Sequence, residues 1–365
     1  MKNFCLYGLM LIFTSLCFGQ LENSRWIFGN DAGIQFTATT AVAAPIPNTH
    51  SFSTFEGSAS VCNANGDLLF FTNGVSVWRN TNTGPEVVIT NQLRGNISSV
   101  QNVIIIPRPN NPNNYYIVTS HGFTGTMTTT GLYFSEISLA TFPGTVVSLN
   151  TPLPDSNGTL VGLNYGQRSE ALTSARHANG TDYWLVAGVR NTGVSQINSY
   201  KVTANGFTLV ANGSSSLPYM GDTKMIKISP DGQRIAAALG NGANLGSFDN
   251  TTGAVTFTTL GLLGGANNKV YGVEFSSNSQ VLYFTNRGTS SLNSVLVTNP
   301  TVINTISANL CYFGLQLAIN GRIYINTSAN CATEAPGTSL SVISNPNNFS
   351  SPQFSYNSFA MGRDC

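Results

Sequence analysis

The sequence predicts an all-β fold: a seven-bladed β-propeller with four strands in each blade, formed by one domain that covers residues 20–365. Three observations favour it. A strand–turn–strand pattern occurs six times, two further strand-like segments follow each copy, and no long segment has the apolar spacing of a helix. Repeats of about 40–50 residues that contain several strands are typical of propellers.

The repeated unit is a hairpin, and residues 271–286, YGVEFSSNSQVLYFTN, show it most clearly. Two apolar segments flank a short polar turn. Asn-Gly and Asp-Gly pairs favour such hairpins because tight turns need residues that tolerate a positive φ. The six turns lie at intervals of 42 to 66 residues and are centred on Asn65-Gly66, Asn113-Asn114, Asn179-Gly180, Asp231-Gly232, Asn278-Ser279 and Asn320-Gly321.

The first strand of each hairpin is the richest in apolar and small residues, so we place it innermost, where the blades meet. The chain ends are predicted to complete the ring. Residues 26–37 read as two strands and residues 42–46 as a third, while the C-terminal residues 359–362 supply the innermost strand of the same blade. Both termini would then share the seventh blade, which removes an open sheet edge. Rings of six or eight blades are the alternatives.

Residues 1–19 have the pattern of a secretory signal peptide, with Lys2 before a mostly apolar stretch and Gly19 before the expected cleavage point. We therefore expect an exported protein, secreted or at the cell surface, with the periplasm as an alternative. No later apolar run is long enough to span a membrane. Charged residues make up only 8% of the chain, and Lys and Arg do not cluster, so nucleic acid is excluded as a partner.

Five segments in one order carry a resemblance to a known family: WIFGNDAGIQF, EGSASVCNANGDLLFFTNGVSVW, HANGTDYWLV, MIKISPDG and YGVEFSSNSQVLYF. Between Trp26 and Asn347 the chain resembles the N-terminal β-propeller of secreted Bacteroidota proteins. Those proteins usually end in a gliding-motility-associated sorting domain of type IX secretion, which this sequence does not contain. The resemblance implies a surface or secreted propeller that binds or adheres, and it supplies no catalytic residues.

Six positions at the start of the innermost strands should ring one mouth of the central channel, and four of the six are charged: Glu56, Gln101, Glu170, Asp222, Lys269 and Cys311. The loops and connectors around the same mouth add amide, basic and aromatic side chains, among them His121, Arg190, Tyr219, Tyr271 and Arg287. Such groups suit an extracellular glycan or a surface protein, because rings stack on sugars and polar groups give directional hydrogen bonds.

Several alternatives remain for this ring of residues. Glu56, Glu170 and Asp222 could hold Ca²⁺ through oxygen ligands, and no other cofactor is expected. Polar side chains at a water-filled mouth can also lack a function. A pair of carboxylates could serve a hydrolase or lyase that acts on a polysaccharide or lactone, although we favour a protein that is not an enzyme. A structural subunit of a surface assembly is the last alternative.

The cysteines and histidines add one structural prediction. Cys311 and Cys331 are equally far from Gly321 on the two arms of the sixth hairpin, so a cross-strand disulfide is predicted; a register slip of one residue would prevent it. The pairing of Cys62 and Cys365 stays open. The three histidines lack metal-ligand spacing, and His177 is expected to be structural.

Overall fold

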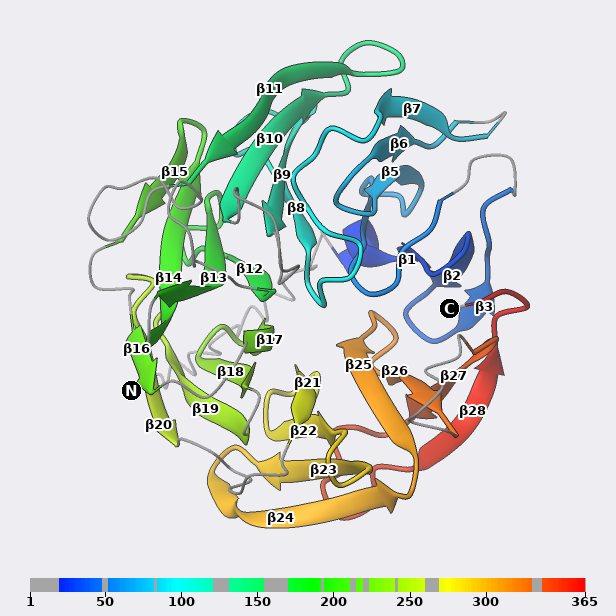
Figure 1. Cartoon of the computed structure of the whole chain (residues 1–365), viewed down its shortest axis with the longest axis vertical. Helices are drawn as coiled ribbons and strands as arrows, with labels where there is room; N and C mark the ends of the chain where they lie inside the picture. The colour runs from blue at the N-terminus through cyan, green and yellow to red at the C-terminus, as the bar shows by residue number, and fades with distance from the viewer. Residues whose placement is uncertain are drawn as a thin grey trace, which may run out of the picture.

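The computed structural model describes residues 20–47, 52–81, 84–120, 131–153, 170–191, 194–210, 215–218, 223–239, 242–259, 269–329 and 337–364. In this part of the chain, 28 strands form seven antiparallel sheets that follow one another around a ring (Figure 1). The prediction of a seven-bladed β-propeller is therefore confirmed.

The first sheet follows a 3-10 turn, η1 (Gln20–Asn23), and contains β1 (Arg25–Phe28), β2 (Ala32–Phe36) and β3 (Ala41–Ala43). The next two are β4 (Ala59–Cys62), β5 (Leu68–Thr72), β6 (Val77–Arg79), β7 (Glu86–Ile89), and β8 (Val103–Pro107), β9 (Asn114–Ser120), β10 (Leu132–Ser138), β11 (Thr145–Pro152). The fourth is β12 (Leu172–Arg176), β13 (Tyr183–Asn191), β14 (Val194–Thr203), β15 (Gly206–Leu209), with β16 (Ser215–Pro218) paired to the other half of β14.

The remaining three sheets repeat the four-strand order. They are β17 (Thr223–Ile228), β18 (Arg234–Leu239), β19 (Gly242–Phe248), β20 (Val255–Thr259); β21 (Val270–Phe275), β22 (Val281–Asn286), β23 (Ser291–Leu296), β24 (Asn299–Ala308); and β25 (Cys311–Leu317), β26 (Ile323–Ser328), β27 (Ser339–Ile343), β28 (Phe354–Ala360). Apart from β16, every strand of the seven described sheets lies where the sequence predicts a strand.

The six predicted hairpins are β4–β5, β8–β9, β12–β13, β17–β18, β21–β22 and β25–β26. Their turns have positive φ where the sequence requires it, for example 88° at Gly66, 69° at Gly232 and 61° at Ser279. The first strand of each hairpin contacts the first strand of its neighbours around the centre of the ring (Figure 1). The predicted innermost position of these strands is thus confirmed, and all six turns lie on one face, which we call the turn face.

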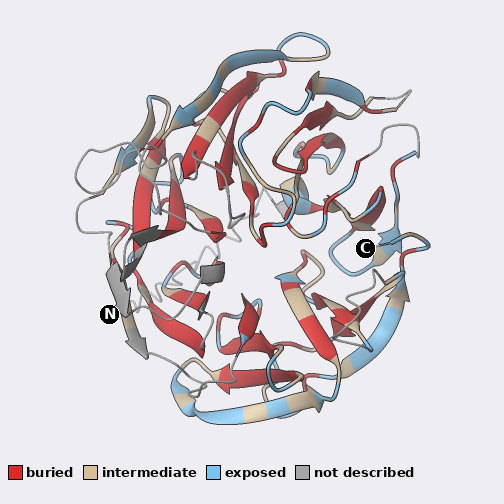
Figure 2. Cartoon of the chain, viewed as in Figure 1, coloured by how far each residue is buried: buried red, intermediate tan, exposed pale blue. Residues whose placement is uncertain are grey.

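The hydrophobic core lies between neighbouring blades. Burial is highest on the inner and middle strands, and the outer strands carry most of the exposed residues (Figure 2). One core cluster joins two blades through Trp184 of β13 and Ile226, Ile235 and Phe248 of the next blade, all at most 3% exposed. Each blade buries its two faces against its neighbours, which is why its strands read as nearly continuous apolar runs.

The closure of the ring differs from the prediction in one respect. The C-terminal strand β28 pairs with β27 as the outermost strand of the last blade, so Phe359 and Ala360 do not enter the N-terminal sheet, whose described strands are β1, β2 and β3. The C-terminal residues beyond β28 still close the ring. Met361 is 2% exposed and packs with Phe36 of β2, and the Asn30 amide donates to the Asp364 carbonyl at 3.0 Å. The termini are joined by packing and loop contacts.

Two sequence predictions concern export and membrane spans. The signal peptide predicted for residues 1–19 is outside the described part of the chain. Among the residues that are described, no helix is long and apolar enough to cross a membrane.

Candidate functional site

The predicted ring of residues lies at the ends of the innermost strands, on the face opposite the turn face. Glu56 precedes β4 by three residues, Gln101 and Glu170 each precede their strands by two, Lys269 directly precedes β21, and Cys311 begins β25. We call this the loop face. Asp222, His121 and Tyr219 lie outside the described residues, and of Arg190 only the backbone in β13 is described.

A hydrogen bond from Tyr271 to Glu56 joins two blades across this mouth. The Tyr271 hydroxyl donates to Glu56 Oε1, although 215 positions separate the two residues. The blades that begin with β4 and β21 are not neighbours in the ring (Figure 1), so the bond reaches across the central region. The predicted mouth is therefore a connected cluster of side chains.

A backbone irregularity positions Tyr271 and its neighbour Phe313. The register of β21 with β22 shifts between Val270 and Val273, and that of β25 with β26 shifts between Tyr312 and Leu315. Each irregularity contains an aromatic residue followed by glycine. Bulges of this kind redirect a side chain out of the regular alternation of a strand. The same local device thus places one ring from each of two adjacent blades at the mouth.

Gly272 and Thr285 hold these two bulges close together. A Cβ at Gly272 would lie 3.0 Å from the Phe313 carbonyl oxygen, so only glycine permits this approach without a shift. Thr285 Oγ1 accepts from the Gly272 amide at 2.9 Å and donates to the Phe313 carbonyl at 2.8 Å. As a result the Tyr271 and Phe313 rings meet edge to face, with centroids 5.8 Å apart.

Arg287, which the sequence predicts as a site residue, lies against both rings. Its Cζ is 5.0 Å from the Phe313 ring centroid and 5.7 Å from that of Tyr271, and its amide donates to the Lys269 carbonyl at 2.9 Å. Arg287 as a whole is half-buried. A cation over aromatic faces is held in place by its attraction to the rings.

Glu170 and Gln101 lie in the same region but in different roles. Glu170 is 6% exposed, and its charge acts on Tyr271 together with that of Glu56. The Gln101 side chain accepts from the Ile226 amide at 2.8 Å and the Leu172 amide at 3.2 Å and donates to the Ile226 carbonyl. Gln101 thus joins inner strands of other blades, and its role in ligand binding stays a prediction.

The electrostatics keep Tyr271 as a hydrogen-bond donor. Burial raises the pKa of its phenol well above the ordinary value, the charges of Glu56 and Glu170 raise it further, and Arg287 lowers it. A phenol in this state remains protonated and donates to a carboxylate at neutral pH. We call Glu56, Glu170, Tyr271, Arg287 and Phe313 the mouth cluster.

Phe55 is a further candidate for the site, which the sequence prediction did not identify. It directly precedes Glu56, is 81% exposed, and its amide donates to the Ile97 carbonyl at 3.2 Å. A large exposed aromatic ring next to a cluster of polar groups is a common feature of binding surfaces. Phe313 was missed as well. A comparison of the repeats two residues further along would have found it, because Tyr271 and Phe313 occupy the same position of successive repeats.

The opposite half of the inner strands contains a different cluster. Lys227 of β17 lies 3.0 Å from Glu274 of β21 and also donates to Gln316 of β25. Glu274 accepts in addition from the Phe275 and Leu317 amides, each at 3.0 Å, and its side chain is 5% exposed. We call Lys227, Glu274 and Gln316 the inner ion-pair cluster. It joins three successive blades, and its groups are committed to one another.

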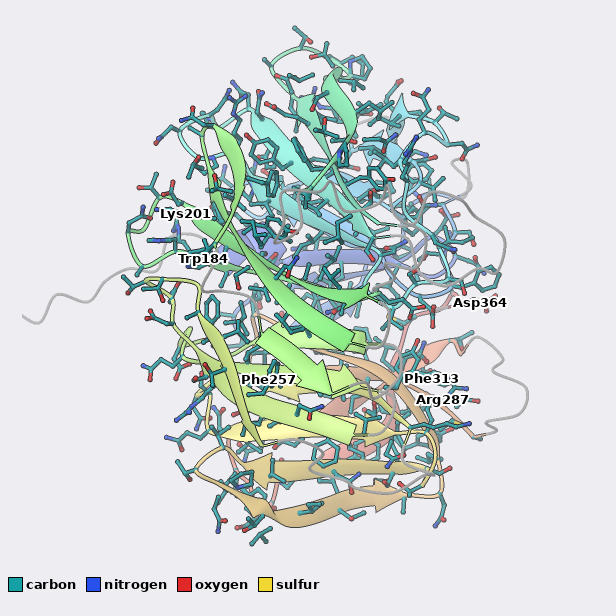
Figure 3. The ribbon with its side chains drawn as sticks, turned by 60° about the vertical axis from the view of Figure 1, so that its left-hand side comes forward. Trp184, Lys201, Phe257, Arg287, Phe313 and Asp364 are labelled. Carbon is teal, nitrogen blue, oxygen red and sulfur yellow. The ribbon has the colours of Figure 1, made fainter. Side chains whose placement is uncertain are left out.

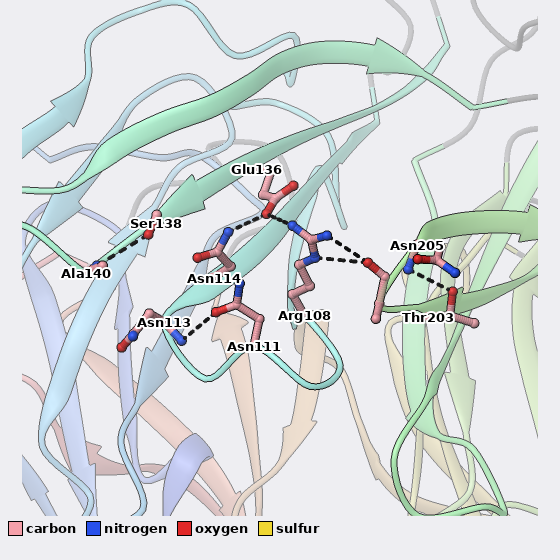
Figure 4. A network of polar contacts seen from close by, with 10 residues as sticks. Arg108, Asn111, Asn113, Asn114, Glu136, Ser138, Ala140, Thr203 and Asn205 are labelled. Atoms are coloured by element: carbon pink, nitrogen blue, oxygen red, sulfur yellow. Dashed lines mark hydrogen bonds and ion pairs between the residues drawn. The ribbon is translucent and has the colours of Figure 1, made fainter.

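A second polar network, around Arg108 and Glu136, lies on the turn face (Figure 4). Arg108 forms an ion pair with Glu136 at 2.6 Å, Asn114 donates to the same carboxylate, and Arg108 also donates to the Ala204 carbonyl of the next blade at 2.8 Å.

His177 stacks on Trp184 with centroids 5.0 Å apart, and its Nδ1 accepts from the Asn179 amide, as expected for a structural histidine. Figure 3 shows Trp184 and Lys201 toward one side of the ring and Arg287 and Phe313 toward the other.

The disulfide and calcium predictions remain predictions. Cys311 is disulfide-bonded and Cys62 is free and buried, so the partner of Cys311 lies outside the described residues, as Cys331 does. Within the described ranges no group of three or more His, Cys, Asp or Glu side chains could hold a metal ion. Asp222, the third predicted calcium ligand, is outside those ranges.

Comparison with known proteins shows the fold. No family model and no curated protein sequence matches the chain. Among solved structures, a proposed 6-phosphogluconolactonase of Bacteroides uniformis is similar with a TM-score of 0.59 and 11% identity, covering 91% of this chain and 94% of that one. A second proposed 6-phosphogluconolactonase, of Bacteroides fragilis, has a TM-score of 0.58 and 11% identity, covering 91% of this chain and 92% of that one. A protein of Lactobacillus plantarum is similar with a TM-score of 0.53 and 13% identity, covering 91% of this chain and 94% of that one.

Proposed function

We propose that this propeller is an exported, non-catalytic protein that binds an extracellular glycan at the mouth cluster on its loop face. The observation that carries the proposal is the arrangement of Arg287 against the rings of Tyr271 and Phe313, beside the carboxylate of Glu56. Exposed Phe55 adds a further ring to this surface.

The chemistry of the cluster suits a sugar. An aromatic face stacks on the apolar face of a pyranose ring, while carboxylate and guanidinium groups accept from and donate to its hydroxyls. The near balance of charge in the whole chain argues against a strongly charged ligand held by electrostatics alone. A surface protein is the alternative partner, and Ca²⁺ bound by Glu56, Glu170 and Asp222 would be an additional component of the site.

A glycan array probed with residues 20–365 tests the proposal directly. The wild-type chain should bind a restricted set of glycans, and Arg287→Ala should weaken that binding at least about tenfold because it removes the donor held between the rings. Glu86→Ala on the exposed outer strand β7 is the matched control and should bind as wild type. Repeating the array with EDTA tests the calcium prediction. Absence of glycan binding, with a cell-surface protein captured instead, would contradict the proposal.

Lactone hydrolysis is the second candidate function. Two carboxylates, Glu56 and Glu170, act on one protonated phenol, Tyr271, which is a combination that can transfer protons. Some structural neighbours are proposed lactonases, although at 11% identity that likeness concerns the fold. Hydrolysis of glucono-δ-lactone that is lost in Glu56→Gln and Glu170→Gln would favour an enzyme. A binding protein predicts no turnover above the spontaneous rate.

A further inference from the structure

A polar pocket lies between the N-terminal sheet and the first hairpin blade, on the turn face and therefore opposite the mouth cluster. Its volume is about 460 Å³, within the range of small-molecule sites. Cross-strand partners Arg25 and Gln35 form one wall. The turn between β4 and β5 and the end of β6 form the other, with Asp67 and Asn80. Leu68 is the one apolar residue among those that line it.

Several polar groups of this pocket have no partner in the described part of the chain. Arg25 donates from Nη2 to the Ala44 carbonyl at 3.2 Å, but its buried Nε has no hydrogen-bond partner there. Gln35 uses its amide nitrogen for two backbone carbonyls and leaves Oε1 available. Asp67 accepts from Asn63 through one carboxylate oxygen, and the Asn80 amide makes no side-chain hydrogen bond within the described residues.

The walls of the pocket are fixed to each other by short contacts. Ser60 Oγ donates to the Arg25 carbonyl at 2.6 Å, and Ser24 Oγ donates to the Gly66 carbonyl at 3.3 Å. Behind the wall, burial lowers the pKa of the Arg25 guanidinium and raises that of the Cys62 thiol. The guanidinium is still charged at neutral pH, since its ordinary pKa is so high. The pocket is thus a preformed site with a fixed set of unused donors and acceptors.

The mixture of these groups selects the class of ligand. A simple anion would satisfy Arg25 but would face the carboxylate of Asp67, and a cation would meet the opposite conflict. A hydroxyl group both accepts and donates, so neighbouring hydroxyls can accept from the Asn80 side-chain amide while they donate to Gln35 Oε1 and Asp67. We propose that this interblade pocket binds one neutral sugar residue, independently of the function proposed for the loop face.

Saturation-transfer NMR with the methyl glycosides of glucose, galactose, mannose, fucose and N-acetylglucosamine tests this proposal on residues 20–365. At least one glycoside should bind with a Kd of about 1–10 mM. The double variant Asp67→Ala/Asn80→Ala should weaken that binding at least about tenfold, since it removes one acceptor and one donor–acceptor group. Both side chains are partly or fully exposed, so the fold should be retained, which circular dichroism can confirm.

Two controls separate this pocket from the mouth cluster. Asn205→Ala removes an exposed amide at another turn of the same face and should leave glycoside binding unchanged, and Arg287→Ala tests whether the glycoside binds at the mouth cluster instead. Binding that is lost in Arg287→Ala and kept in the double variant would place the sugar at the mouth and overturn the proposal. It would also be overturned by binding of none of the five glycosides, or by tighter binding of glucuronate than of the glucoside.

Discussion

The mouth cluster and the inner ion-pair cluster are built on the same inner strands but use their charged groups in different ways. Lys227, Glu274 and Gln316 lie five residues after Asp222, Lys269 and Cys311 of the predicted ring, so both clusters repeat with the blades. Glu274 is 5% exposed on its side chain and engages one ammonium group and two backbone amides. At the mouth, Arg287 is half-buried between rings and Phe55 is 81% exposed.

The comparison separates polar side chains that stabilise the fold from polar side chains that can contact a ligand. A buried charge must find its partners inside the protein, because leaving it unpaired is costly. The inner ion-pair cluster fulfils this and joins three successive blades. The mouth cluster joins blades that are not neighbours, and the exposed ring of Phe55 directly precedes Glu56 in the sequence. Substitutions should accordingly affect stability in the first region and binding in the second.

Glu274→Ala should produce the largest effect on stability. It leaves the Lys227 ammonium without its carboxylate and two backbone amides without an acceptor, so the free energy of unfolding should fall by about 3–5 kcal/mol. Urea denaturation followed by circular dichroism measures the loss. Glu86→Ala on the exposed rim should change it by less than about 0.5 kcal/mol. Equal stability of the two variants would mean that the inner ion pair does not hold the blades together.

Cys331→Ser should have the next largest effect. If Cys331 is the partner of Cys311, the bond closes a loop that ends at the loop face, and loss of such a cross-link lowers the free energy of unfolding by about 3 kcal/mol. Peptide mapping without reduction should show the two cysteines linked. A map that links Cys311 to Cys365 would refute the pairing, and the variant should then be nearly as stable as wild type.

Tyr271→Phe should affect both stability and binding. The variant keeps the ring that packs on Phe313 and Arg287 but removes the donor to Glu56, which costs about 1–3 kcal/mol for a hydrogen bond to a charged group. Glycan binding should weaken about tenfold, because the carboxylate is no longer held toward the rings. The same array used for the wild type measures it. An unchanged unfolding midpoint together with unchanged binding would remove Tyr271 from the site.

The sequence was sufficient for the fold because the determining signals are local. Asn65-Gly66 and Asp231-Gly232 need a positive φ at their second residue, and apolar runs on each side of the turn set the strands. The closure was only partly predictable, since an apolar FAMG segment can end an outer strand as well as form an inner one. In the structure Met361 enters the core after β28 has paired with β27.

The candidate site was less predictable because its main bond joins distant parts of the chain. Counting back from each turn placed Glu56 and Glu170 at the mouth, and the loop position of Arg287 followed from the same scheme. The hydrogen bond from Tyr271 to Glu56 crosses the ring and depends on a bulge at Gly272, which no local pattern reports. Gln101 was predicted correctly in place, but the backbone groups that it binds come from two other blades.

Phe55→Ala should have the smallest effect on stability and thus gives the clearest separation of the two regions. The ring is 81% exposed, so its removal should change the free energy of unfolding by less than about 0.5 kcal/mol. Glycan binding should nevertheless weaken about tenfold, because a stacking surface is lost. Val302→Ala, an exposed apolar residue of the outer strand β24, is the matched control and should change neither quantity. If Phe55→Ala and Val302→Ala bind glycans equally well, the exposed ring of Phe55 is not part of the binding surface, and the site narrows to Glu56, Arg287, the buried ring of Tyr271 and the partly buried ring of Phe313.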